Sequence, residues 1–420
     1  MNILLINHYA GSVRHGMEYR PYYLAREWVR LGHRVRIVAS ARSHIRARAP
    51  ELGGADRLDE TIDGIDYTWF ATPPYQGNGA ARVRNIASFV LRLYREGRAL
   101  VREVRPNVVI ASSTYPLDIW PAHRIARLAG ARLLFEVHDL WPLSPMELGG
   151  YSRRHPFIML LQAAENYACR HADAVVSILP KVREHLEAHG MAPHKLLVVP
   201  NGTDPAEWLS DAPELPAELE RSLDALRARA ALIVGYAGTH GIANALDTLL
   251  DAAVLLRARS APTRQIAFVL VGGGPGKPAL QRRAHQLGLD NVHFFDPVAK
   301  HQVPALLRRF DLAYIGWQRQ PLYRFGIAPN KLIDYMMAAR PVLHAVDAGN
   351  DPVAEAGCGL TVAPDDPRAL ADGVLAMLSL GEAGRAALGQ RGRAYAMANL
   401  TYPVLGQRFL TAFAGGTSHG

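Results

Sequence analysis

A lysine and an aspartate near the start of one predicted helix have the chemistry needed to hold a nucleotide. In the segment APNKLIDYMM the helix begins at about Asn330, and Lys331 and Asp334 then share a face at i,i+3 spacing. An ammonium group binds a diphosphate, and a carboxylate accepts hydrogen bonds from both hydroxyls of a ribose. The alternative is a surface ion pair that contributes less than ~1 kcal/mol. Only five of the 47 basic residues are lysines, which favours a functional role for Lys331.

Two glycine-rich segments follow predicted strands and are candidates for phosphate binding. The first, GYAGTHG, ends in Gly238, Thr239, His240 and Gly241 and precedes a predicted helix whose first turn includes Asn244. Amide groups at such a helix N-terminus bind anions, although a turn that needs glycine only for steric reasons explains the segment equally well. The second, VGGGPGK at 271–277, is not a triphosphate-binding loop. Valine stands where that motif needs its first glycine, and proline follows where it needs Ser or Thr.

A histidine and an aspartate end another buried strand, in the segment EVHDLWP. His138 and Asp139 therefore lie at the carboxyl end of a parallel strand, where α/β sheets bind their ligands. The alternative is a histidine whose ring is satisfied by a backbone carbonyl, but the position favours a catalytic role. The first strand of the chain is followed by HYAGSVRHG and not by G-x-G-x-x-G, which argues against a nicotinamide-dependent dehydrogenase.

The elements that position these residues alternate between strands and helices, twice along the chain. Short apolar runs such as ILLIN, RLLFEV and IAFVLV are typical of buried parallel strands, and amphipathic segments separate them. The pattern predicts an α/β protein with two Rossmann-like domains facing each other across a cleft. We expect an N-terminal domain at 1–203, a connector at 204–230 and a C-terminal domain at 231–395. A last helix at 396–413 and a disordered tail at 414–420 complete the prediction.

The composition is that of an ordinary globular enzyme. Hydrophobic residues make up 49% and charged residues 20% of the 420 positions, so the chain is not of the disordered class. The two cysteines are far apart, which argues against a disulfide framework or a zinc cluster. Apolar runs are shorter than the ~18–20 residues of a membrane span, and the signal-peptide pattern is missing. We therefore expect a cytoplasmic protein that contacts at most the inner face of the membrane.

The segment 81–106 predicts an amphipathic helix with a basic polar face. Opposite its apolar stripe lie Arg84, Arg95, Arg98, Arg102 and Arg105. Contact with anionic lipid headgroups and a plain solvated face are equally good interpretations. We expect no binding of nucleic acid, because no aromatic residues alternate with the arginines as stacking platforms. The net charge of +9 reflects arginine-rich usage throughout the chain more than a function.

These segments together resemble glycosyltransferase family four, whose retaining enzymes have the GT-B fold. The resemblance rests on ALIVGYAGTHGIANALDTLLDAA, on IAFVLVGGGPGKPALQRRAHQLGLDNVHFFDPVAKHQVPALLRRFDLAYI, and on APNKLIDYMMAARPVL with GCGLTVAPDDP. The N-terminal HGMEYRPYYLAREWVRLGHRV and EVHDLWPLSP are similar to the subgroup that builds bacterial O-antigen and capsule sugars, including N-acetylfucosaminyl transferases.

The resemblance implies a nucleoside-diphosphate sugar as donor, usually UDP-linked, and no obligatory metal or other cofactor. The donor would bind the C-terminal domain and the acceptor the N-terminal domain, onto which a final helix returns. Asp334 matches the second acidic residue of the family's Glu-x7-Glu motif, which holds the ribose, while Gly326 stands in place of the first Glu. Thr239 and His240 stand where the family has a basic pair, so Lys331 would supply the missing phosphate charge.

Further roles follow from the same resemblance. His138 matches a histidine beside the transferred sugar. Pro297 and Val298 match the loop whose backbone reads the base. The match near the N-terminus implies four acceptor contacts, namely His15, Gly16, Glu18 and Arg20.

The sequence thus predicts a retaining glycosyltransferase of bacterial surface polysaccharide or lipopolysaccharide synthesis. Its donor would be a UDP-linked sugar, with an N-acetylated amino sugar as one candidate, and its acceptor a lipid-linked or glycan molecule. We expect His138, Asp139 and Lys331 to be catalytic, with loop amides and Lys331 stabilising the leaving diphosphate. The sequence offers no obvious carboxylate that could form a covalent intermediate. This favours front-face attack assisted by the leaving phosphate over a double displacement. A sugar-nucleotide 2-epimerase of the same fold and a non-catalytic sugar-nucleotide-binding protein are the alternatives.

Overall fold

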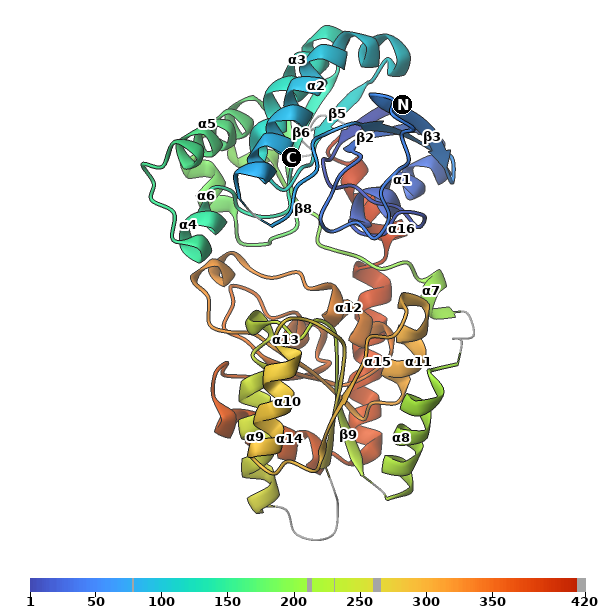
Figure 1. Ribbon diagram of the computed structural model, residues 1–420, viewed down its shortest axis with the longest axis vertical. Helices are drawn as coiled ribbons and strands as arrows, with labels where there is room; N and C mark the ends of the chain where they lie inside the picture. Colours follow the sequence, from blue (N-terminus) through green and yellow to red (C-terminus); the bar gives the residue numbers. More distant parts are fainter. Residues whose placement is uncertain (78, 210–213, 230, 260–265, 414–420) are drawn as a thin grey trace, which may run out of the picture. The chain divides into compact units, whose positions relative to one another are not determined.

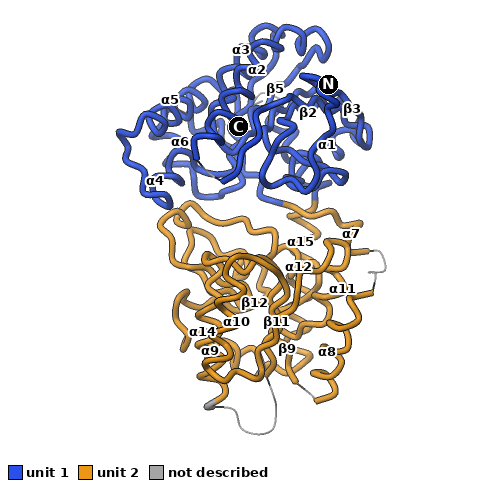
Figure 2. The backbone as a smooth tube through the Cα atoms, viewed as in Figure 1, with its two compact units in different colours: residues 1–201, 402–420 blue, residues 202–401 orange. Residues whose placement is uncertain are grey.

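The computed structural model describes residues 1–420 except 78, 210–213, 230, 260–265 and 414–420 (Figure 1). The expected tail at 414–420 therefore lies outside the described residues. The chain divides into two compact units (Figure 2). Unit 1 contains residues 1–201 and 402–420, and unit 2 contains residues 202–401.

Unit 1 is built on an eight-stranded sheet with the order β3-β4-β2-β1-β5-β6-β7-β8. Neighbouring strands run parallel except for β3 and β4, which form an antiparallel pair at the edge. The order reverses between β1 and β5, and in such sheets ligands bind at the carboxyl ends of the strands beside this switch point. The strands are β1 (Asn2–Ile6), β2 (Arg34–Ser40), β3 (Arg57–Ile62), β4 (Ile65–Phe70), β5 (Val108–Ala111), β6 (Arg132–Val137), β7 (Ala174–Ser177) and β8 (Leu196–Val198).

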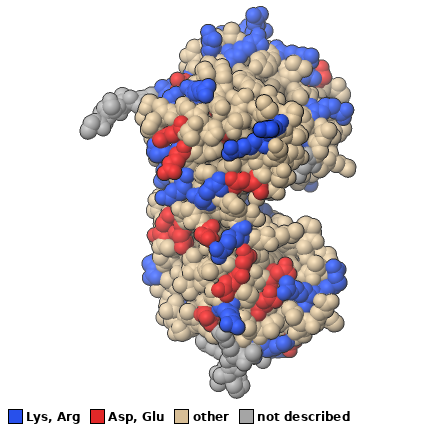
Figure 3. Space-filling model, turned by 90° about the vertical axis from the view of Figure 1, so that its left-hand side faces the viewer, with Lys and Arg blue, Asp and Glu red and all other residues tan. Residues whose placement is uncertain are grey.

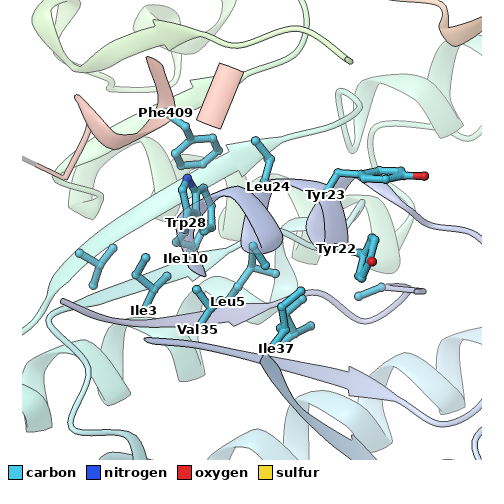
Figure 4. Close-up of a cluster of buried hydrophobic side chains, with 14 of the residues drawn as sticks. Ile3, Leu5, Tyr22, Tyr23, Leu24, Trp28, Val35, Ile37, Ile110 and Phe409 are labelled. Atoms are coloured by element: carbon cyan, nitrogen blue, oxygen red, sulfur yellow. The ribbon is translucent and has the colours of Figure 1, made fainter. Parts of the chain in front are cut away.

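Helices cover both faces of this sheet (Figure 1). On one face α1 packs with α16, and on the other α2, α3 and α5 pack against one another. The ring of Trp28 meets that of Phe409 at 5.1 Å between centroids, above the apolar side chains of β1 and β2 (Figure 4). The helices are α1 (Arg20–Arg30), α2 (Ala80–Val104), α3 (Ile119–Ala129), α4 (Leu143–Gly149), α5 (Pro156–His171), α6 (Arg183–Ala188) and α16 (Tyr402–Leu410).

Unit 2 has a six-stranded parallel sheet with the order β11-β10-β9-β12-β13-β14. One face is covered by α8, α11, α12, α13 and α15, and the other by α9, α10 and α14. Its strands are β9 (Leu232–Ala237), β10 (Ile266–Val271), β11 (Val292–Phe295), β12 (Leu312–Gly316), β13 (Val342–Ala345) and β14 (Gly359–Val362). Its helices are α7 (Ala206–Leu209), α8 (Ala217–Ala228), α9 (Leu246–Arg259), α10 (Lys277–Gln286), α11 (Val303–Arg308), α12 (Asn330–Met337), α13 (Pro352–Ala356), α14 (Pro367–Ser379) and α15 (Gly381–Asn399).

The unit boundaries differ from the predicted domain boundaries at two places. The segment 204–230, expected as a connector, contributes Trp208 and Leu223 to the core of unit 2 and therefore belongs to it. The chain returns to unit 1 after Thr401 and not at 396, because α15 packs on α12 and buries Ala396 in the same core. Thr203 and Thr401 form an isolated parallel β-bridge, so the two ends of unit 2 lie side by side.

Within the described part of the chain, no helix combines the length and the apolar character needed to cross a membrane.

Candidate active site

The two glycine-rich segments of unit 2 pack against each other at the carboxyl ends of β9 and β10. The amides of Gly238 and His240 donate to the carbonyls of Val271 and Gly273, at 2.9 and 2.7 Å. Gly272 has a φ of +154°, and a Cβ on it would lie 1.8 Å from the Gly238 carbonyl oxygen, so only glycine fits. Two amides of the first segment are thus used inside the fold, and donor binding by the four residues stays a prediction. The amides of Thr239 and Gly241 are the remaining candidates.

The first segment does not continue directly into a helix, which is a second difference from the prediction. A 3₁₀ turn at Ile242–Asn244 separates it from α9. The His240 ring is fully buried, and neither ring nitrogen has a hydrogen-bond partner among the described residues. Burial, with the positive charges of Lys277 and Lys331, lowers the pKa of His240 to about 4. His240 is therefore a neutral side chain beneath the segment, and its predicted contact with the donor stays a prediction.

Lys331 extends from the start of α12 across Gly238. A Cβ on Gly238 would lie 3.0 Å from the Lys331 Nζ. This Nζ donates hydrogen bonds to the Tyr236 hydroxyl and to Asn244 Oδ1, each at 2.7 Å. Among the described residues it forms no ion pair with a carboxylate, and burial lowers its pKa to about 8. Thus a half-buried cation is held in a fixed position over the glycine segment, without an opposite charge.

Asp334 lies one turn further along α12. Burial raises its pKa to about 7, and the charge of Glu207 acts in the same direction while that of Lys300 opposes it. Lys300 Nζ and Glu207 Oε1 are themselves paired at 2.7 Å. The surface ion pair between Lys331 and Asp334, which the sequence left as an alternative, does not occur in the described structure.

Two loops complete this edge of unit 2. The Pro297 ring lies against Gly273, since a Cβ on that glycine would be 3.2 Å from Pro297 Cγ, while Val298 packs on the core. Gly326 ends the 3₁₀ turn at Pro321–Phe325 with a φ of +92°. Residues with a side chain rarely adopt this conformation, which is a physical reason for glycine at the position where the family has a glutamate. Asn330, as predicted, is the first residue of α12.

In unit 1, polar side chains meet beside the switch point of the sheet. Asn7 follows β1, and its Nδ2 donates to the Ser112 carbonyl at 2.6 Å. The Ser112 hydroxyl, which follows β5, donates to Glu136 Oε2 at 2.6 Å. The His138 Nε2 lies 3.0 Å from Ser112 Oγ and 3.2 Å from Glu136 Oε2. His138 is thus oriented by a buried carboxylate and a hydroxyl, and not by a backbone carbonyl.

Glu136 also forms a buried ion pair with Arg20. The Arg20 Nε lies 3.0 Å from Glu136 Oε1, and both side chains are 1% exposed. Burial alone would raise the pKa of Glu136, but the charges of His138 and Arg20 and the hydrogen bonds from His138 and Ser112 hold it at about 2. The remaining guanidinium nitrogens of Arg20 donate to backbone carbonyls of residues 199 and 200. Arg20 is therefore an internal residue, which corrects its expected role as an acceptor contact.

Asp139, predicted to be catalytic, has its oxygens occupied within the fold. It accepts hydrogen bonds from the Leu140 amide at 2.8 Å, the Ser144 hydroxyl at 2.6 Å and the Trp141 indole at 3.1 Å. These contacts fix the turn between β6 and α4. Asp139 therefore positions this turn. Of the two residues, His138 is the one whose surroundings are those of an active-site side chain.

The remaining predicted acceptor contacts lie in the loop between β1 and α1. His15 is 9% exposed, and its ring nitrogens lie 2.9 Å from Ser12 Oγ and 3.5 Å from Glu60 Oε1. Gly16 has a φ of +91°, where glycine is favoured. Both residues shape the loop, and Glu18 alone of the four presents a partly exposed charged side chain.

The sequence reasoning missed Asn7, Ser112 and Glu136. Each has a signal that could have been used, because each is a polar residue in or directly after an apolar strand pattern: ILLIN, NVVIASS and RLLFEV.

Comparisons with known proteins agree with this architecture. Residues 15–202 match the glycosyl transferase 4-like domain, and residues 231–379 match glycosyl transferases group 1. The chain is 25% identical over 369 residues to the putative colanic acid biosynthesis glycosyl transferase WcaI of Escherichia coli, covering 84% of this chain and 86% of that protein.

Two solved structures share the fold over nearly the whole chain. WaaG, a glycosyltransferase involved in lipopolysaccharide biosynthesis, has a TM-score of 0.64 at 16% identity, with 99% of this chain and 100% of that chain covered. Anabaena HepE, in complex with UDP and glucose, has a TM-score of 0.65 at 17% identity, with the same coverage. The chain therefore has the GT-B fold of two Rossmann-like domains and belongs to the glycosyltransferases that combine a GT4-like domain with a group 1 domain.

Proposed function

We propose that this enzyme is a retaining glycosyltransferase that moves a sugar from a UDP-sugar to a lipid-linked acceptor in the synthesis of a bacterial surface polysaccharide. The observation that carries the proposal is the Lys331 ammonium, which is held over Gly238 with no carboxylate partner in the described structure. A desolvated cation in this position stabilises a bound diphosphate. The UDP in the HepE structure and the biosynthetic functions of WcaI and WaaG support the same reaction class.

In this proposal unit 2 binds the donor. Lys331 and the amides of Thr239 and Gly241 contact the diphosphate, Asp334 accepts from the ribose hydroxyls, and the backbone at 297–298 contacts the base. Charge builds up on the diphosphate as the glycosidic bond breaks, and donors already in place stabilise it without reorganisation. The leaving phosphate takes the proton of the acceptor hydroxyl as that hydroxyl attacks from the same face.

Unit 1 binds the acceptor. His138, held by Glu136 and Ser112, is the residue proposed to contact the reacting sugars, and Glu18 is a candidate for contact with the acceptor. The outer face of α2 carries exposed arginines that suit the anionic inner face of a membrane, where a lipid-linked acceptor resides. In one view of the whole molecule, Lys and Arg side chains form separate groups with Asp and Glu beside several of them (Figure 3). Membrane contact is therefore expected to be local.

Lys331→Ala tests the proposed donor site. The variant should raise the Kd for UDP about 10- to 100-fold, which corresponds to ~1.5–3 kcal/mol for a lost charge-assisted bond. Lys277→Ala is the matched control, since the Lys277 Nζ already pairs with Asp296 at 2.7 Å. Calorimetry measures both variants. Equal UDP affinities in wild type and Lys331→Ala would refute the assignment.

Asp334→Asn tests ribose recognition. Wild type should bind UDP more tightly than dUDP, and the variant should lose most of this difference while its circular dichroism is unchanged. A variant that keeps the full preference for ribose would contradict the role of Asp334.

Release of UDP from a UDP-sugar separates the remaining functions. A transferase releases UDP faster when a lipid-linked acceptor is added. An epimerase changes the sugar without needing an acceptor, and a non-catalytic protein binds the donor without turnover.

A further inference from the structure

A cavity of about 850 Å³ lies within unit 1, outside the residues assigned above to the reaction. It is lined by the start of α2, the turn into α4 with that helix, and the start of α5. Apolar side chains dominate its walls, among them Ile86, Leu148, Phe157 and Ile158. A cavity of this size accommodates a ligand or a segment of hydrocarbon chain.

The mouth of the cavity exposes large apolar side chains. Leu148 is 59% exposed and Tyr151 is 46% exposed, and both line the cavity. Single apolar side chains are often exposed on a protein surface without a function. Exposed apolar side chains that are grouped around a pocket indicate a binding site.

Positive charge borders the same cavity. Arg82, Arg84 and His155 are among its lining residues, and Arg153 and Arg154 next to His155 are exposed. The Arg82 guanidinium lies 5.7 Å from the centre of the Trp141 ring, which also lines the cavity. An apolar interior with a basic border fits an amphiphile that has a hydrocarbon chain and an anionic head.

The cavity also adjoins the candidate acceptor site. Asp139 and Trp141 line its wall and follow His138 directly in the turn that Asp139 fixes. The wall of the cavity is therefore continuous along the chain with the residue proposed to contact the reacting sugars.

We infer that this cavity binds the hydrocarbon chain of a lipid-linked phosphate or diphosphate acceptor, with the head group next to the basic border. The inference rests on the proposed function, because it identifies where the lipid part of that acceptor is held. It differs from contact of the α2 arginines with the bilayer surface, because the chain leaves the bilayer and enters the protein.

Alkyl phosphates of increasing length test the inference without any nucleotide. Calorimetry should show wild-type affinity rising about fourfold for each methylene added between butyl and octyl phosphate, the factor that corresponds to ~0.8 kcal/mol per buried methylene. Inorganic phosphate, which has no chain, should bind most weakly. Equal affinities for butyl and octyl phosphate would overturn the inference.

A cavity-filling variant provides the second measurement. Ala87 lines the cavity on α2, so Ala87→Trp should remove the chain-length dependence while UDP affinity stays at the wild-type value. Ala163→Trp is the matched control, since Ala163 is exposed on α5 but does not line the cavity, and it should behave as wild type.

Two other outcomes distinguish a lipid-binding cavity from a bilayer contact and from a failure of the proposed transfer reaction. If Ala87→Trp kept octyl phosphate binding but lost binding to anionic vesicles, the region would be a bilayer contact and the inference would be wrong. If wild type showed the chain-length dependence but no acceptor ever stimulated UDP release, the proposed transfer reaction would fail while the lipid site remained.

Discussion

At the scale of single residues, two titrating groups should set the pH range of donor binding. Asp334 must be ionised to accept from ribose, and its pKa is raised to about 7 by burial, so affinity should rise as pH increases through 7. Lys331 must be protonated, and burial lowers its pKa to about 8, so affinity should fall as pH increases through 8. The affinity for UDP-sugar, measured by calorimetry from pH 6 to 9.5, should therefore be bell-shaped.

Single variants assign the two limbs of this profile. Asp334→Asn should flatten the acid limb and Lys331→Gln the alkaline limb, each with weaker binding at the optimum. A profile whose limbs persist in both variants would show that other groups cause them.

Glu136 should be a large contributor to the stability of unit 1. Glu136→Ala leaves the Arg20 guanidinium buried without its partner, which costs about 3–5 kcal/mol of unfolding free energy. The pKa of Glu136 is lowered from 4.5 to about 2, so its ionised form stabilises the fold fully above pH 4.5, and this contribution is lost as pH falls through 2. Urea titrations at several pH values measure both effects, and Glu136→Gln should show a weaker acid dependence than wild type.

The sequence predicts the residue types at the ends of the strands. It does not predict which of these residues face a ligand. His138, Lys331 and Asp334 were recognised because they follow apolar strands or open a helix. The burial of Arg20 depends on Glu136, which is 116 positions away in sequence. A local sequence pattern cannot predict a contact between residues so far apart. The packing of His240 beneath the second glycine segment is unpredictable for the same reason.

At the scale of elements, α2 provides a test of membrane contact. Arg95, Arg98 and Arg102 are exposed on this helix and form no ion pair with any described residue. Changing all three to Gln should weaken binding to anionic vesicles about 100-fold, since each basic residue near a membrane contributes about 1 kcal/mol. Binding of wild type should also fall steeply with added salt. UDP affinity should not change.

The matched control removes the same charge from unit 2. It replaces three exposed residues, Arg221, Arg282 and Arg368, by Gln. Equal loss of vesicle binding in the two triple variants would mean that net charge, and not the face of α2, governs the interaction.

Most strands and helices can be predicted because their apolar runs are short and bounded by turns. The elements that the sequence does not predict lack such a clear local pattern. The edge strand β3 reads RLDETI, which carries alternating polar residues, and among the described strands it pairs only with β4. The segment 204–230 was expected as a connector because it is rich in Pro, Glu and Arg. Its assignment to unit 2 depends on Trp208 and Leu223, which reach a core formed by residues about 100 positions later.

At the scale of the whole molecule, α16 joins the end of the chain to the core of unit 1. Phe409 is fully buried against Trp28, and the Trp28 indole donates to the Gly406 carbonyl at 3.1 Å. Phe409→Ala should therefore destabilise unit 1 by about 3–5 kcal/mol. Hydrogen exchange should increase in β1 and α1 but not in α12, and UDP affinity should stay unchanged. Gln407→Ala, at an exposed position of the same helix, is the control and should have little effect.

The order of the units along the chain has a consequence for synthesis on the ribosome. Unit 2 is one continuous stretch, residues 202–401, while unit 1 needs residues 402–413 to cover Trp28. At about 5–20 residues per second, roughly 10–40 s separate the emergence of these two parts of unit 1. During that interval, while unit 2 is being synthesised, the nascent chain exposes the apolar face of α1. The part of the enzyme that is made first is thus the last to finish folding.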